Sequence, residues 1–179
     1  MNILVISASL NSDSYSRVLA REAETALAAD GHTATFLDLR ELPLPLCDGE
    51  TAYGHENVLR ASKMVAGSDG IILATPIYNY DANAAAKNLV ELTGRAWTDK
   101  VVGFLCAAGG ASSYMSIMAL ANSLMLDFRC VIVPRFVYSS GAAFADGKIV
   151  DSQIAARVAE CAKATATLAA AVKTLHETR

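Results

Sequence analysis

Short runs of apolar residues alternate with longer segments of helical periodicity along the whole chain. The apolar runs predict five strands, at residues 3–7, 34–38, 70–75, 101–107 and 131–134. The runs at 3–7, 70–75 and 101–107 are continuously apolar, as expected of strands that are buried on both faces of a sheet. The segments between the runs predict helices near residues 15–30, 55–67, 83–95, 113–127 and 151–176.

This alternation of strands and helices is typical of an α/β protein with a parallel sheet and right-handed crossovers. Two strand orders are common in such folds, the classical dinucleotide-binding order and the flavodoxin-like order 2-1-3-4-5. Five strands with a helix closing the chain favour the second order. We therefore expect residues 1–179 to form a single domain, a flavodoxin-like three-layer sandwich whose five-stranded parallel sheet has the order 2-1-3-4-5.

Two segments depart from the alternation. Residues 42–48 form a connection interrupted by prolines, and residues 136–150 resemble a loop or a hairpin with a turn at Asp146-Gly147-Lys148. Insertions of this kind build subunit contacts or cover a site in some proteins and only pack against the core in others. The sequence leaves both interpretations open.

Composition narrows the class of protein. With 53% hydrophobic and 18% charged residues, the chain is too apolar to be disordered. A net charge of −3 without any run of Lys or Arg argues against nucleic-acid and anionic-membrane partners. The apolar runs are too short to span a bilayer, and no basic segment precedes the first strand, so we expect no signal peptide. Four scattered cysteines without a CxxC pair predict reduced thiols, a cytoplasmic location and no metal site.

Candidate chemistry begins in the loop after the first strand, which is rich in hydroxyl groups. In an open α/β sheet the ligand lies at the carboxyl ends of the strands, and phosphate binds at the N-terminus of the helix that follows. The chain has neither GxGxxG nor a P-loop motif. The loop instead offers a set of short hydrogen-bonding side chains: Ser9, Asn11, Ser12, Ser14 and Ser16. A simpler interpretation is that Ser14 only caps the helix.

Two further loops fall at the same edge of the predicted sheet. The segment Pro76-Ile77-Tyr78-Asn79-Tyr80 offers aromatic faces and an amide, which suit a planar ring with polar edges, although it also reads as an ordinary turn. Gly109 and Gly110 allow close approach of a ligand to the backbone, or they form a flexible turn. Ser112 or Ser113 is expected to cap the next helix.

Together these loops resemble the NADPH-dependent FMN reductase family, which comprises flavodoxin-like quinone, azo and flavin reductases. The resemblance lies in Ser9-Leu-Asn-Ser-Asp-Ser-Tyr-Ser16, in Thr75-Pro-Ile-Tyr-Asn79 followed by Ala86-Lys-Asn88, and in Gly109-Gly110-Ala111. The chain departs from the family pattern at Asn11, where Arg is usual, and at Ser16, where Asn is usual. This loop would therefore present less positive charge to a bound phosphate than is usual in the family. Lys87 and Asn88 are expected to be structural.

The resemblance implies a set of FMN-binding residues. Those that would hold the phosphate are Ser9, Asn11, Ser14, Tyr15 and Ser16. Those that would line the ribityl chain and the flavin ring are Pro76, Ile77, Tyr78 and Asn79. Those expected beside the pyrimidine edge of the ring are Gly109, Gly110, Ser112 and Ser113.

The implied activity is an FMN-dependent NAD(P)H oxidoreductase. NADPH or NADH would pass hydride to N5 of the flavin, and an acceptor would then take its place in a ping-pong cycle, with no catalytic side chain. The acceptor is a quinone, a free flavin, an azo compound or a metal oxyanion, and the sequence selects none of them. The resemblance also implies a homodimer or homotetramer, with the Ala-rich helices and residues 136–150 as candidate contacts.

Three other functions are weaker. A flavodoxin that transfers electrons without nicotinamide turnover is the main alternative, but flavodoxins tend to be more acidic than this chain. A receiver-like switch would need acidic residues after the first strand, where Ser7-Ala8-Ser9 stands instead. A cofactor-free hydrolase would need a histidine near a strand end, and none is present.

Overall fold

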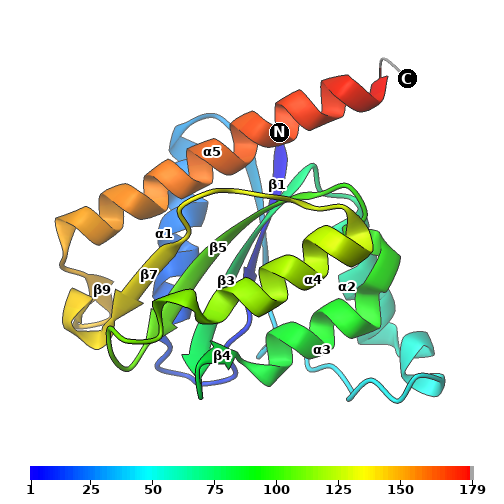
Figure 1. The fold of residues 1–179 in the computed structure, drawn as a ribbon, viewed down its shortest axis with the longest axis horizontal. Helices are drawn as coiled ribbons and strands as arrows, with labels where there is room; N and C mark the ends of the chain where they lie inside the picture. The colour runs from blue at the N-terminus through cyan, green and yellow to red at the C-terminus, as the bar shows by residue number, and fades with distance from the viewer. Residues whose placement is uncertain (178–179) are drawn as a thin grey trace.

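The computed structural model describes residues 1–177 and contains a central parallel sheet between two layers of helices (Figure 1). The main strands are β1 (Asn2–Ser7), β2 (Thr33–Asp38), β3 (Gly70–Tyr78), β5 (Val101–Ala108), β6 (Val131–Ile132) and β7 (Val137–Ser140). The α-helices are α1 (Tyr15–Ala29), α2 (Glu56–Ala66), α3 (Ala84–Thr93), α4 (Met118–Phe128) and α5 (Ser152–Glu177). Short 3-10 helices are η1 (Thr51–Gly54), η2 (Gly94–Trp97), η3 (Tyr114–Ile117) and η4 (Gly141–Ala143).

The strand order is β2-β1-β3-β5-β6, and β7 also pairs with β5 in parallel. The predicted flavodoxin-like order is therefore confirmed, with the last strand divided into two pieces. Both pieces extend the same edge of β5: Val131 pairs with Val101, and Val137 pairs with Leu105. Pro134 and Arg135 lie between them, and Arg135 has a φ of 58°. Because proline cannot donate to a ladder, and a left-handed residue breaks the extended backbone, pairing stops at this point and then resumes.

The split corrects one prediction. Residues 136–150 were expected to be a loop or a hairpin, but Val137–Ser140 is a strand of the central sheet. The remainder does contain the predicted hairpin, formed by β8 (Phe144–Ala145) and β9 (Lys148–Ile149). Its two turn residues, Asp146 and Gly147, have φ values of 49° and 70°, which is the geometry of a tight two-residue hairpin turn.

Two apolar layers enclose the sheet because successive side chains of each strand point to opposite faces. On one face, Ile3, Val5 and Ile72 pack against α1 and α5. On the other face, Leu4, Ile6 and the fully buried Phe104 pack against α2, α3 and α4. Figure 1 shows α5 on one side of the sheet and α3 and α4 on the other. In residues 1–177, no helix is both long enough and apolar enough to cross a membrane.

Candidate functional site

The loops after β1, β3 and β5 meet at the carboxyl edge of the sheet and enclose a cleft of about 630 Å³. The lining residues are Ser9, Asn11, Asp13, Ser14, Tyr15, Ser16, Pro76, Ile77, Tyr78, Asn79, Ala107, Ala108, Gly109 and Gly141. All FMN-binding residues predicted in the first two loops thus lie on one cleft, together with Gly109, whereas Ser12 and Tyr80 do not line it. Gly110, Ser112 and Ser113 belong to the third loop but do not line it. Parallel strands bring these segments together because their carboxyl ends share one edge.

The first loop presents hydrogen-bond donors to the cleft. Ser14 is the N-cap of α1, and its Oγ accepts a bond from the backbone N–H of Arg17 at 3.3 Å, so the capping interpretation is correct for this residue. The N–H groups of Tyr15 and Ser16 belong to the first helical turn and have no acceptor within the helix. The Ser9 hydroxyl accepts from Asn11 N–H at 3.3 Å, and among the described residues it donates to none. The cap made by Ser14 therefore leaves the Ser9 hydroxyl and the N–H groups of Tyr15 and Ser16 free to donate to an anion.

Arg17 holds this loop in shape from behind. Its guanidinium donates to the backbone carbonyls of Ser9, Asn11 and Ser12 at 2.9, 2.6 and 3.1 Å. The same group donates to the Asp38 carboxylate at 2.6 and 3.2 Å. Only arginine has enough donors in a fixed plane to make all five contacts. The Arg17 charge is matched by Asp38, so we assign this side chain to loop support rather than to direct contact with a ligand.

The second loop is a tight hairpin between β3 and the two-residue strand β4 (Asp81–Ala82). Its turn residues Asn79 and Tyr80 have φ values of 51° and 63°. Asparagine suits the first of these left-handed positions, but the second is normally occupied by glycine. Tyr80 is 67% exposed, and its hydroxyl lies 3.4 Å from Ser112 Oγ in the third loop. The strained turn thus connects two loops of the site, in keeping with the clustering of backbone strain at functional sites.

Asn83 joins the first loop to the second, and sequence reasoning missed this role. Its buried Nδ2 donates to the Ala8 carbonyl at 2.8 Å, and its Oδ1 accepts from Thr75 Oγ1 at 3.0 Å. The same Oδ1 caps α3 by accepting from the Ala86 N–H at 3.2 Å. An asparagine directly before a helix signals an N-cap, but no local signal reveals a partner 75 residues away.

The third loop is held by aromatic side chains of the neighbouring strand. Tyr138 of β7 donates a hydrogen bond to the Gly110 carbonyl, and its hydroxyl lies 2.7 Å from Ser113 Oγ. Tyr114 stacks on Phe136 with a centroid distance of 4.9 Å. Ser113 stands at the N-cap position of η3, the helix that follows, but its side chain makes no cap bond, and α4 has no side-chain cap bond either.

The segment after β7 packs beside the first loop and borders the cleft through Gly141. The Phe144 ring stacks on Tyr15, with centroids 4.4 Å apart and planes inclined by 11°. Gly141 lines the cleft directly, and a side chain there would meet the Tyr15 ring. The segment 136–150, which the sequence left open between packing and covering a site, contributes to both.

Of the pair Lys87 and Asn88, which was expected to be structural, Asn88 has that role. Asn88 Nδ2 donates to the Pro45 carbonyl and its Oδ1 accepts from Cys47 N–H, both at 2.9 Å, so the side chain fixes the extended segment 42–48 against α3. Lys87 forms an exposed ion pair with Glu91 at 2.9 Å.

Thiol chemistry is remote from the cleft. All four cysteines are free, and Cys106, Cys130 and Cys161 are buried. Burial raises the pKa of Cys130 to about 12 and that of Cys161 to about 11. A thiol is reactive as its thiolate, so these side chains are inert near neutral pH.

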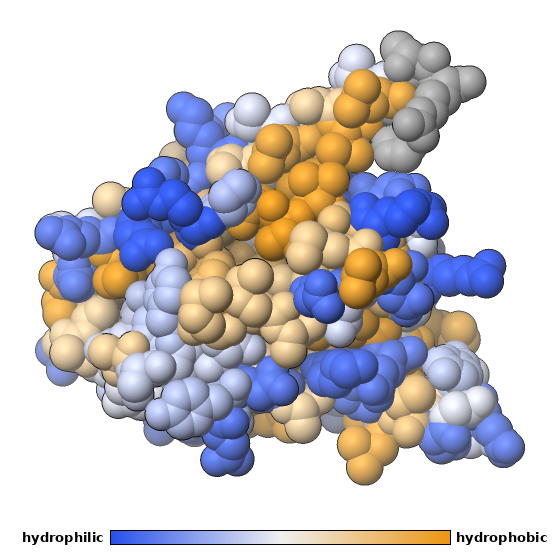
Figure 2. Space-filling model, viewed as in Figure 1, coloured by the Kyte–Doolittle hydropathy of each residue, from blue (hydrophilic) through white to orange (hydrophobic). Residues whose placement is uncertain are grey.

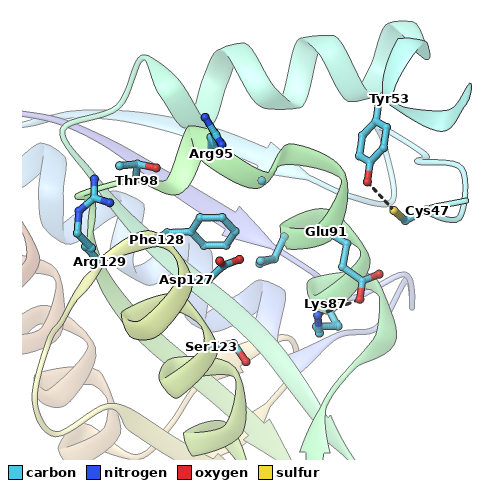
Figure 3. Close-up of a pocket in the computed structure, with 12 residues that line it drawn as sticks. Cys47, Tyr53, Lys87, Glu91, Arg95, Thr98, Ser123, Asp127, Phe128 and Arg129 are labelled. Carbon is cyan, nitrogen blue, oxygen red and sulfur yellow. Dashed lines mark hydrogen bonds and ion pairs between the residues drawn. The ribbon is translucent and has the colours of Figure 1, made fainter. Parts of the chain in front are cut away.

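A second hollow of about 800 Å³ lies outside the predicted site, between the carboxyl ends of α3 and α4 (Figure 3). Figure 3 shows its lining residues as a mixture of charged, polar and apolar side chains, among them Arg95 and Asp127. Within the described chain, neither Arg95 nor Asp127 takes part in an ion pair.

The parallel sheet of order 2-1-3 and the donor-lined cleft at its carboxyl edge define a flavodoxin-like protein with a site for a phosphate-bearing ligand. The model of the NADPH-dependent FMN reductase family matches residues 1–145, and the chain belongs to that family. The protein is therefore an FMN-containing, NAD(P)H-dependent oxidoreductase, as the sequence resemblance predicted.

Relatives of known name agree with this assignment. The chain is 29% identical to an NAD(P)H-dependent FAD/FMN reductase of Geobacillus thermodenitrificans over 131 residues, which cover 71% of this chain and 70% of the relative. It is 33% identical to a 2-hydroxy-1,4-benzoquinone reductase of a Burkholderia species, over 58% of this chain and 55% of the relative. The fold is shared with the flavoenzyme NAD(P)H:(acceptor) oxidoreductase FerB of Paracoccus denitrificans, with a TM-score of 0.76, 21% identity and 97% coverage of both chains.

The residues of the cleft fit FMN. A phosphate needs several donors at one end, and the first loop supplies the Ser9 hydroxyl and the free N–H groups of the α1 N-terminus. A planar ring needs apolar and aromatic walls, and Pro76, Ile77 and Tyr78 supply them at the other loop.

Proposed function

We propose that this enzyme transfers reducing equivalents from NADPH or NADH to a small acceptor in a ping-pong cycle, with a quinone as the acceptor class that its relatives favour. A free flavin, an azo compound or a metal oxyanion are the other acceptors that such a site could serve. When bound, FMN supplies the redox chemistry, accepting hydride from the nicotinamide and passing it to the acceptor. One observation carries the proposal: the predicted FMN-binding residues of the first two loops and Gly109 of the third line a single cleft.

In this proposal, the first loop binds the phosphate of FMN. Ser9 and Asn11 offer side-chain hydrogen bonds, and because the hydroxyls of Ser14 and Ser16 bond each other at 2.8 Å, one of these two retains a free proton. The N–H groups of Tyr15 and Ser16 lie at the positive end of the α1 dipole. Arg17 keeps the loop carbonyls turned back toward its guanidinium, and therefore away from the anion. No side chain of this loop that faces the cleft carries a positive charge, and Asp13 also lines it. Binding of FMN should therefore depend on hydrogen bonds more than on charge.

The second and third loops would position the ring. Tyr78 is 54% exposed at the mouth of the cleft and offers a flat face for stacking. Gly109 borders the opposite side, where a Cβ atom would meet no other group of the protein within 4 Å. The described cleft is a single open space above these loops, so the nicotinamide and the acceptor would occupy it in turn. Such alternate occupation is what the proposed ping-pong cycle requires.

The test is a steady-state experiment on the purified protein loaded with FMN. Initial rates are measured over a grid of NADPH or NADH and 1,4-benzoquinone concentrations. Parallel lines in the double-reciprocal plot are expected, because one substrate leaves before the next binds. Intersecting lines would contradict the ping-pong cycle. Flavin that is not bleached by either nicotinamide under anaerobic conditions would contradict the proposed reductase and favour an electron carrier.

We also propose that the protein is a homodimer or a homotetramer, with α4 and the hollow beside it as the contact surface. Met118, Met125 and Leu126 of α4 are 40%, 39% and 76% exposed, and Figure 2 shows apolar side chains over this helix. Exposed apolar patches of this kind mark interaction sites. In a two-fold contact each residue pair occurs twice. Arg95 and Asp127, of opposite charge and without ion pairs in the described chain, would pair across such a contact.

Light scattering after gel filtration tests this arrangement. The substitution Asp127→Lys should shift the protein toward monomer, and the double substitution Arg95→Glu with Asp127→Lys should restore the oligomer because the charges are exchanged. A monomeric unaltered protein at micromolar concentration would contradict the proposal.

A cytoplasmic location is proposed as well, supported by four cysteines that form no disulfide with one another.

A further inference from the structure

The hydroxyl of Tyr138 ties together the two ends of the glycine loop after β5. It donates to the carbonyl of Gly110, and it lies 2.7 Å from the hydroxyl of Ser113. Tyr138 stands on β7 opposite Cys106, so its position is set by the parallel ladder between β5 and β7. The ring packs edge-on against Tyr114 at a centroid distance of 5.6 Å. A strand of the rigid sheet thus holds an otherwise irregular loop.

The direction of these hydrogen bonds follows from counting protons. A tyrosine hydroxyl has one proton, and a carbonyl oxygen can only accept. The Tyr138 proton therefore goes to Gly110, so Ser113 must donate to Tyr138. The resulting chain runs from Ser113 through Tyr138 to the Gly110 carbonyl, and hydrogen bonds in such a chain polarise and strengthen one another.

This series of hydrogen bonds fixes the orientation of the peptide group between Gly110 and Ala111. In a planar trans peptide the carbonyl and the following N–H point in opposite directions. With the Gly110 carbonyl turned toward Tyr138, the N–H of Ala111 is turned away from β7. In the described structure no hydrogen bond engages the backbone N–H of Gly110 or that of Ala111. Glycine has no Cβ to resist a peptide flip, so the Tyr138 hydroxyl is the group that selects this orientation.

We propose that Tyr138 is a positioning residue for FMN. Gly110 and Ala111 follow directly after Gly109, which lines the cleft, and Tyr138 keeps their N–H groups available to the edge of the ring that extends beyond Gly109, which favours the reduced form of the ring. The inference rests on the proposed function. Fixed N–H donors stabilise negative charge where it develops. The reduced ring carries more negative charge than the oxidised ring, so it gains more from these donors. A flipped peptide would present its carbonyl instead and would disfavour the reduced ring.

The experiment compares Tyr138→Phe with the unaltered protein. Phenylalanine keeps the ring and its contact with Tyr114 but removes the hydroxyl. The quantities measured are the dissociation constant of oxidised FMN and the midpoint potential of the bound flavin, from an anaerobic spectroelectrochemical titration. The control is Tyr53→Phe, because Tyr53 lines the hollow beside α3, and within residues 1–177 its hydroxyl forms a hydrogen bond with Cys47 alone. Both variants lose one tyrosine hydroxyl.

Tyr138→Phe should bind oxidised FMN nearly as well as the unaltered protein, whereas its preference for reduced over oxidised FMN should fall. One hydrogen bond to a charged group corresponds to a change on the order of tenfold. For a two-electron couple, a tenfold change lowers the midpoint potential by about 30 mV. Tyr53→Phe should leave the potential unchanged. A purely structural role would weaken both forms of FMN equally and would not move the potential.

An unchanged potential in Tyr138→Phe would overturn the proposal. If that variant does not fold, Ser113→Ala decides the question, because it removes the donor that polarises Tyr138 and keeps the bond to Gly110. It should shift the potential in the same direction by a smaller amount, and no shift would overturn the proposal. Failure of the unaltered protein to bind FMN would instead overturn the proposed function, and this inference with it.

Discussion

Replacing Asn83 by alanine should weaken both the fold and the cleft. The substitution removes the donor to the Ala8 carbonyl, the acceptor for Thr75 Oγ1 and the cap of α3. Loss of the cap costs about 1 kcal/mol. The Ala8 carbonyl belongs to a fully buried residue that water does not reach, and leaving such a group unsatisfied costs roughly 2 kcal/mol. The free energy of unfolding should therefore fall by about 3 kcal/mol.

The expected loss is measured by urea denaturation followed by circular dichroism. For a protein of this size, 3 kcal/mol corresponds to a decrease in Tm of about 6–12 °C. FMN affinity, measured by quenching of flavin fluorescence, should fall about tenfold because Ala8 adjoins Ser9 and Asn83 lies on the second loop. Asn83→Asp keeps the cap oxygen but sets a carboxylate oxygen against the buried Ala8 carbonyl in place of the donor. It should therefore retain the cap, lose the link between the loops, and cost more stability than loss of the donor alone.

Asn88→Ala is the matched control, because it also removes an asparagine that bonds to two backbone groups. Its partners lie in a half-buried segment that water can reach, so the expected loss is only about 1 kcal/mol. FMN affinity should not change, since Asn88 lies outside the cleft. Equal losses of stability for the two alanine variants, or unchanged FMN affinity in Asn83→Ala, would refute the reasoning.

Other substitutions and reagents test separate features. Arg17→Lys should raise the dissociation constant of FMN about tenfold, because lysine cannot hold three carbonyls and Asp38 at once; a titration that gives the unaltered value would contradict the clamp. Tyr80→Gly should raise the free energy of unfolding by roughly 0.5–1 kcal/mol by relieving the left-handed backbone, whereas Tyr80→Ala should give no gain. Iodoacetamide at pH 8 should label only Cys47 in the folded protein, as mass spectrometry would show. The pKa of Cys161 is raised to about 11, so its thiolate fraction at this pH is about a hundredfold below that of a free thiol. Rapid labelling of a second thiol without unfolding would contradict this.

The sequence predicted the parts of the fold that depend on burial. The runs at 3–7, 70–75 and 101–107 became β1, β3 and β5 because a strand covered on both faces has no polar positions. The last strand was predicted only in part. Val137–Ser140 has two serines and follows a proline, so nothing local distinguishes it from a loop. Its ladder with β5 is a tertiary effect.

In the cleft, too, some residues could be predicted from local sequence and others depend on tertiary contacts. The residues that line it could be predicted because parallel topology brings strand ends together, whatever the details of the loops. The residues that hold the loops could not. Asn83 resembles an ordinary helix cap, and Tyr138 resembles a core aromatic residue in a loop. Their partners are 75 and 28 residues away, so their roles follow only from the folded chain.

The break between β6 and β7 divides the last strand into two segments that pair with different parts of β5. Val131 and Ile132 complete the edge of the sheet next to the start of β5, while residues 137–140 reach the end of β5 that borders the cleft. An insertion or a changed spacing at Pro134 and Arg135 would therefore move β7, which borders the cleft, while β6 and the core of the sheet stay in place. For protein engineering, the interruption offers a place to alter the cleft end of the sheet while the pairing of β6 with β5 is kept.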